Sequence, residues 1–143
     1  MPTESQADLA YATEALDFHR AITVPAGPVA ASRAELDALH RHILALYTLF
    51  DVHTTRTRPV ARTEADHLRA VRIRLWQAAE HLHAAFHSAP YPGTGHLPSR
   101  EECRARLPQG APELTICRRH LATAVLVRRA HTPAELRGPS TRL

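Results

Sequence analysis

The sequence predicts an all-α protein, a four-helix bundle with one or two short additional helices. Four long segments of the 143-residue chain repeat apolar residues every three or four positions, the period of a helix with one buried face. Runs rich in Pro and Gly separate the segments, and none of them alternates like a strand. We therefore expect a single domain over residues 1–143, ordered from about 4 to 137, with a frayed tail at 138–143.

The first helix is expected from about residue 4 to 23, because the prolines of the following Val-Pro-Ala-Gly-Pro-Val run cannot continue a helix. The second is expected from 32 to about 53. Ser32 and Glu35 form a capping-box pattern, in which both side chains satisfy free backbone N–H groups. Large apolar residues follow at helical spacing: Leu36, Leu39, Ile43, Leu46 and Phe50.

The third helix is expected over 63–88, with Thr63 and Asp66 as a weaker capping pair. Its predicted inner stripe is Leu68, Val71, Leu75, Ala78, Ala79, Leu82 and Phe86. Trp76 lies on the flank of that stripe, which predicts a place at an edge of the bundle.

The C-terminal third contains one more long helix. A capping box opens a short helix over 99–107, and the long helix is expected over 113–130. Thr132, Pro133 and Glu135 give an N-cap, a Pro at the first helical position and an acid at the third, which predicts a last short turn.

Composition and charge exclude some classes of protein. All 18 basic residues are Arg, a bias typical of a high-GC genome such as that of an actinobacterium. No stretch reaches the length of a membrane span, and the N-terminus lacks a basic-then-apolar signal, so we expect a cytoplasmic protein that acts without a membrane. The net charge is −4 over residues 1–55, +3 over 56–99 and +5 over 100–143. Acidic and basic helices packed side by side would explain this asymmetry.

Histidine is the conspicuous excess, at 11 residues. His83 and His87 are spaced four apart on the third helix, and Glu80 precedes them on the same face, so the three side chains could hold zinc or another divalent cation. Their direction, about 90° to 130° from the centre of the predicted stripe, favours a site at the bundle edge or at an oligomer contact.

Two other metal sites are open alternatives. His19, His53 and His120 lie on the inner sides of three different helices and could converge as a three-histidine site. A Cys2His2 set, whose spacing matches no standard zinc motif, consists of His96, Cys103, Cys117 and His120. The competing interpretation is that each histidine is a core or boundary residue with one hydrogen bond, and that Cys117 is a small core residue.

Other chemistry has little support. The chain has no Gly-x-Ser-x-Gly and no Gly-rich phosphate loop, and Cys103 lacks an identifiable base although Arg104 and Arg106 adjoin it. Arg69 and Arg72 share a helical face that could follow a phosphate backbone, but no helix-turn-helix and few interleaved aromatic residues accompany them.

Several strings together resemble a family of small uncharacterised helical proteins, a domain of unknown function, from Streptomyces and related actinobacteria. They are ALDFHRAITVPAGP from Ala15, ELDALH from Glu35, RLWQAAEHLH from Arg74 and RLPQGAPELTIC from Arg106. The fold is also similar to the DinB/YfiT-like metal bundles, which carry one His on the second helix and a His-x-x-x-His pair on the last long helix. Here that pair is on the third helix, and the fourth has only His120, so the analogy transfers no residues.

The sequence thus favours a non-catalytic regulatory or adaptor protein that acts through protein contacts, including self-association as a homodimer, with no cofactor required. A small metal-dependent enzyme of DinB/YfiT-like type is the alternative, and an Arg-driven nucleic-acid-binding protein is the second alternative. A divalent metal such as zinc is the cofactor that the histidine clusters could hold.

Overall fold

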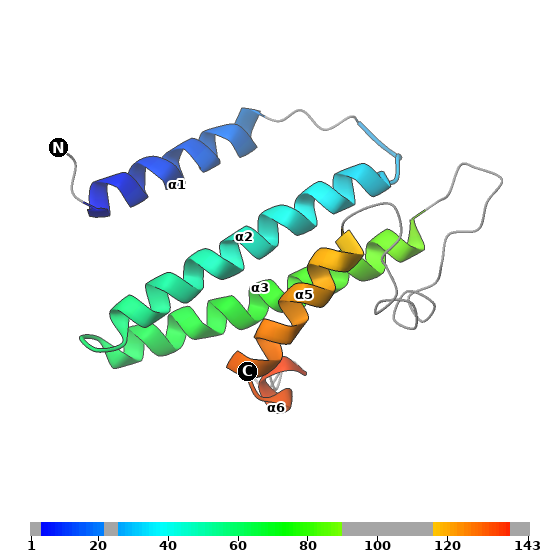
Figure 1. The fold of residues 1–143 in the computed structure, drawn as a ribbon. Coiled ribbons are helices and arrows are strands. Elements are labelled where there is room, and N and C mark those ends of the chain that lie inside the picture. Colours follow the sequence, from blue (N-terminus) through cyan, green and yellow to red (C-terminus); the bar gives the residue numbers. More distant parts are fainter. Residues whose placement is uncertain (1–3, 22–25, 90–115, 138–143) are drawn as a thin grey trace. The chain divides into compact units, whose positions relative to one another are not determined.

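The computed structural model describes residues 4–21, 26–89 and 116–137, and these residues form helices and connecting turns with no strand (Figure 1). The all-α prediction is confirmed. Contacts divide the chain into two compact units, residues 1–30 and 31–143. The first unit contains α1, Glu4–Ala21, and the predicted end of that helix at residue 23 lies outside the described residues. None of the described helices is long and apolar enough to cross a membrane.

The second unit is built on a long hairpin of α2, Arg33–Thr57, and α3, Arg62–Ser88, whose packing on each other dominates its contacts (Figure 1). The capping box at the start of α2 is confirmed: Glu35 N–H donates to Ser32 Oγ over 3.1 Å, and Ser32 N–H donates to Glu35 Oε1 over 3.2 Å. These bonds satisfy backbone donors that have no partner within the helix.

Two helix boundaries differ from the prediction. The helix α2 continues past His53 to Thr57, and the buried Thr54 hydroxyl donates to Phe50 O over 2.7 Å within this last part. The predicted capping pair of α3 is wrong: the N-cap is Ala61 without a side-chain bond, and Asp66 instead pairs with Arg58 at 3.0 Å.

The helix α5, Ile116–Ala130, lies against both members of the hairpin, and the short α6, Pro133–Leu136, lies against α3 (Figure 1). The expected helix at 99–107 and the first residues of the one expected at 113–130 lie outside the described residues. Capping at Thr132 is confirmed, since Glu135 N–H donates to Thr132 Oγ1 and Thr132 N–H donates to Glu135 Oε1.

The buried apolar residues that the structure describes in the second unit form two clusters. The cluster near the start of α5 contains Leu36, Phe86, Ile116 and Cys117. The second cluster, further along the hairpin, contains Leu44, Tyr47, Trp76, Ala79 and Val127. Trp76 is therefore a core residue, and its predicted place at the bundle edge is wrong. The inward face of α3 is rotated from the predicted stripe and includes two polar residues with partners, Arg72 and His83.

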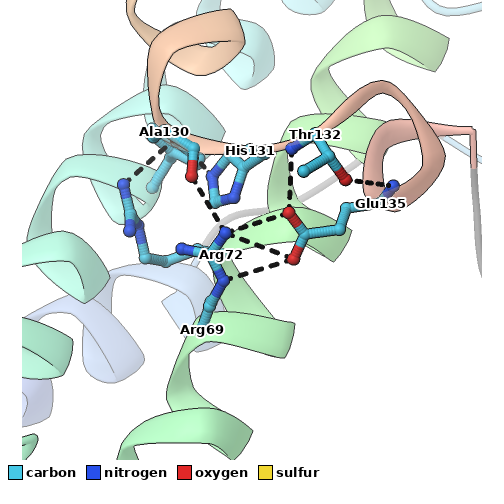
Figure 2. A network of polar contacts seen from close by, with 7 residues as sticks. Arg69, Arg72, Ala130, His131, Thr132 and Glu135 are labelled. Atoms are coloured by element: carbon cyan, nitrogen blue, oxygen red, sulfur yellow. Dashed lines mark hydrogen bonds and ion pairs between the residues drawn. The ribbon is translucent and has the colours of Figure 1, made fainter.

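Polar side chains fix the C-terminal end of α5 and the turn into α6 (Figure 2). Arg69 forms a two-oxygen ion pair with Glu135 and donates to Ala130 O over 2.9 Å. Backbone donation from Thr132, followed by the Arg69 side chain, lowers the pKa of Glu135 to about 2. His131 is buried and bonds to the Tyr47 hydroxyl at 2.9 Å.

Truncating Val127 should show whether α5 packs on the hairpin in solution. Val127 is 0% exposed, whereas its neighbour Leu126 is 59% exposed. Val127→Ala should lower the free energy of unfolding by about 2 kcal/mol, because it removes two buried methyl groups and leaves a cavity. Leu126→Ala should change it by less than ~0.5 kcal/mol. Denaturant unfolding of both variants tests the packing, and equal effects would contradict it.

Candidate metal centre

Titratable side chains from three helices meet between the two apolar clusters. The helix α2 contributes Asp37 and His40, α3 contributes Glu80, His83 and His87, and α5 contributes Cys117, Arg119 and His120. His40 lies one helical turn from Leu36 and Leu44, and His83 lies one turn from Ala79 and Phe86, so the helical period turns both imidazoles toward the interior. Several are buried, including His40 at 0% and His83 at 4% exposure. Buried polar groups of this kind need partners, and the partners define two different arrangements.

The first arrangement is a linear chain of hydrogen bonds from Arg119 to Glu80. Arg119 Nη1 lies 3.0 Å from His40 Nδ1, His40 Nε2 lies 2.8 Å from His120 Nδ1, and His120 Nε2 contacts Glu80 Oε1. A guanidinium group can only donate, so His40 Nδ1 accepts and its Nε2 carries the proton. His40 then donates to His120 Nδ1, and His120 donates from Nε2 to the Glu80 carboxylate.

Arg119 carries a positive charge at one end of this polar chain, and His40 beside it is neutral near pH 7. Arg119 Nη2 donates to Asp37 Oδ1 over 2.7 Å, and Arg119 Nη1 also donates to the Asp37 carbonyl. Burial, followed by the nearby His120 and Arg119, lowers the pKa of His40 from 6.5 to about 3. The His120 ring stacks on Trp76 with centroids 4.5 Å apart and planes 10° from parallel. These contacts fix the position of His120 and use both of its ring nitrogens.

The second arrangement is convergent. His83 and His87 are four residues apart on α3, and their Nε2 atoms lie 3.1 Å from each other. Cys117 Sγ, from α5, lies 3.6 Å from His87 Nε2, and the three donor atoms all lie within 4.8 Å of one another. Three donor atoms that meet at one point are the pattern of ligands around an ion, whereas the chain from Arg119 to Glu80 pairs each nitrogen separately.

The separations suit a small cation. Tetrahedral zinc holds nitrogen at about 2.0–2.1 Å and sulfur at about 2.3 Å, which places neighbouring donors roughly 3.3–3.6 Å apart. The observed 3.1 and 3.6 Å are close to those values. One thiolate and two imidazoles select zinc, cobalt or copper(I) over magnesium and calcium, which prefer oxygen ligands. Three protein ligands also leave a fourth coordination position for water or another small ligand.

A family model described as a family of unknown function (DUF6238) matches residues 1–143. The chain belongs to DUF6238. No curated protein and no solved structure matches it. The resemblance to an uncharacterised family is thereby confirmed, and the chemistry of the site has to be argued from its geometry.

The structure brings together part of the predicted metal set in this DUF6238 protein. His83 and His87 meet as expected, and α3 turns them toward α5, so that His83 is buried rather than at an edge of the bundle and His87 is half-buried. Glu80, the third predicted ligand, contacts His120 instead. Its place is taken by Cys117, which is 0% exposed and belongs also to the apolar cluster beside it.

The alternative sites have different outcomes. His120 bonds to His40 and Glu80. Because His53 lies 13 residues, about 20 Å, further along α2 than His40, the structure does not bring His53 to His120. His53 instead contacts Arg56. His19 is an exposed residue of α1, in the other unit. The Cys2His2 set includes His96 and Cys103, which lie outside the described residues.

The arginine pair considered for nucleic-acid binding is engaged within the protein. Arg69 pairs with Glu135, and Arg72 is buried, donates to the Tyr47 hydroxyl over 3.2 Å and pairs with Asp51. These contacts explain both residues without a phosphate ligand.

Sequence reasoning missed His40 and the role of Arg119. His40 continues the spacing of Leu36, Leu44 and Tyr47, all of which are buried in α2. That spacing was the available signal, because a polar residue within an apolar stripe needs a buried partner. The identity of the partner could not be read from the sequence, since Arg119 is 79 residues away.

Proposed function

We propose that this protein is a transition-metal-binding protein of regulatory type, and that it holds one zinc-like ion through His83 Nε2, His87 Nε2 and Cys117 Sγ. The convergence of these three donor atoms within 4.8 Å supports the proposal. Two of them come from adjacent turns of α3, so that helix already holds half of a tetrahedral ligand set in place. The polar chain beside them contacts this ligand set through His120, whose ring lies 4.5 Å from that of His83 between centroids.

The regulatory role expected from the sequence fits this site better than a catalytic one. Coordination would join α3 to α5, since 29 residues lie between His87 and Cys117 in the chain. Metal occupancy would therefore affect how these two helices pack. The cytoplasmic location expected from the sequence suits the thiol ligand, because reducing conditions keep it available. The bias toward Arg without Lys supports an actinobacterial origin.

Metal content of the untagged protein tests the proposal. We expect about one zinc ion per chain by elemental mass spectrometry, and thiolate-to-cobalt charge-transfer absorption when cobalt replaces zinc. Cys117→Ser, His83→Gln and His87→Gln should each weaken binding by at least ~100-fold, since each removes a direct ligand. Cys117→Ser should also abolish the charge-transfer band.

Two control variants separate this site from the sites predicted by sequence alone. His81→Gln changes an exposed histidine of the same helix and should leave the affinity unchanged. Glu80→Gln removes the carboxylate once expected to be a ligand, and it should weaken binding by no more than ~10- to 100-fold, the effect of losing a supporting contact, and by less than the loss of a direct ligand. No uptake of zinc, cobalt or copper(I) by the folded protein would refute the proposal, and so would uptake that Cys117→Ser leaves unchanged.

A further inference from the structure

The helix α5 is attached to the hairpin by two independent sets of contacts. At its C-terminal end, Val127 is buried in the second apolar cluster, and Arg69 and Tyr47 bind Ala130 O and His131. At its N-terminal end, Ile116 and Cys117 pack on Leu36 and Phe86. The C-terminal contacts involve none of the three proposed ligands, so they hold that end whether or not a metal is bound.

The proposed ligands are divided unevenly between the two helices. His83 and His87 are both on α3, whose backbone alone sets their spacing, whereas Cys117 is the single ligand from α5. A metal ion bound by the two histidines is already fixed to α3. The bond to Cys117 Sγ is then the one bond that connects the ion to α5, and it acts on the second described residue of that helix.

From this division we infer that metal occupancy is a switch at the N-terminal end of α5. The inference rests on the proposed metal site. A bound zinc-like ion holds the first turns of α5 on α3, and loss of the ion allows these turns to separate from the hairpin while the C-terminal end stays attached. Separation uncovers the apolar surface of Leu36 and Phe86, which Ile116 and Cys117 cover in the closed state.

The polar contacts near Cys117 limit how far the separation extends. Arg119 binds Asp37 and His40 one half-turn further along α5, and His120 joins the polar chain. These bonds have to be broken before the opening reaches Val127. The switch is therefore local, and it changes the packing of one end of one helix rather than the fold.

Hydrogen exchange of the untagged full-length protein, with zinc and with a chelator, tests the switch. We expect zinc to slow exchange of the amides of residues 120–123 by at least tenfold and those of residues 127–130 by less than threefold. A gradient along α5 is the signature of attachment at one end, because exchange reports local opening. Zinc binding is measured on the same samples by elemental analysis, so that occupancy is known for each exchange experiment.

Two variants complete the test. Cys117→Ser, which keeps a small side chain in the core, should lose the zinc-dependent protection of residues 120–123 even at zinc concentrations that saturate the two histidines. His81→Gln should behave as the native protein does. Bound zinc with uniform protection, or with none, would overturn the switch and leave the proposed metal site standing. Absence of bound zinc, cobalt and copper(I) would overturn both.

Discussion

Replacing Arg119 by methionine should lower the free energy of unfolding by about 3–5 kcal/mol, because it removes the buried partner of Asp37 and leaves only the exposed Arg41 beside that carboxylate. The side chains of Arg119 and Asp37 are only 17% and 13% exposed, and their 2.7 Å contact is the shortest described ion pair between an arginine and a carboxylate. The same change also removes the donor to His40 Nδ1, at the head of the polar chain. Chemical denaturation at constant metal content measures the loss.

A matched control and a rescue make this prediction specific. Arg41 also contacts Asp37, at 3.4 Å, but its side chain is 65% exposed. Arg41→Met should therefore cost less than ~1 kcal/mol, as surface ion pairs do. Asp37→Leu combined with Arg119→Met removes both buried charges and should recover part of the loss. Similar costs for the two arginine variants would mean that water reaches Asp37 and that the pair is not buried in solution.

Acidification should destabilise the native protein through His40. Its pKa is lowered to about 3 when folded, mainly by burial, against 6.5 when exposed. Below about pH 6.5, His40 therefore binds a proton in the unfolded chain but stays neutral in the folded chain. The free energy of unfolding has its full value above that pH and falls as the pH drops from 6.5 to 3. His40 alone should cost about 3 kcal/mol between pH 7 and pH 4.

Glutamine at position 40 offers a test of this pH dependence. Its amide oxygen can accept from Arg119 and its amide nitrogen can donate to His120, so His40→Gln mimics the neutral imidazole without titrating. The variant should be less stable at pH 7 but should lose less stability on acidification than the native protein. His67→Gln, at an exposed position of α3, is the control. Measurements are made with a chelator present, because protons also compete with metals. Equal pH dependence in all three proteins would exclude His40 as the cause.

Burial lowers the pKa of His131 as well, with Arg69 and Arg72 acting in the same direction. This second histidine adds to the acid sensitivity, and its contribution persists in the His40→Gln variant. Its protonation would reverse the bond to Tyr47, because both nitrogens of an imidazolium can only donate.

Much of the fold could be predicted because its signals are local. Capping boxes at Ser32 and at Thr132 have short-range physical causes, and the structure has both. The inward face of α3 was predicted less well, because the spacing of its apolar residues favoured a buried stripe through Leu68 and Val71. Arg72 and His83 occupy inward positions instead, and they can do so because other helices supply their partners or ring neighbours.

The candidate site could be predicted only where its residues share a helix. His83 and His87 were identified from their spacing, which fixes their separation wherever α3 packs. Cys117 was not assigned to them, because the contact depends on how α5 lies across the hairpin, and helical periodicity does not determine that crossing. The contact between Glu80 and His120 could not be predicted for the same reason, since His120 comes from α5.

The guanidinium at the head of the polar chain has a consequence for proton transport. A chain of hydrogen bonds transfers a proton only if every member can donate a proton to the next group and then accept one from the group before it. If Glu80 drew a proton from His120, the imidazole of His40 would reload His120 and would then need a proton from Arg119, which releases none at accessible pH. Conduction therefore stops at His40. Glu80 stands at the solvent end of this chain, and the chain carries no proton from there to the interior beyond His40.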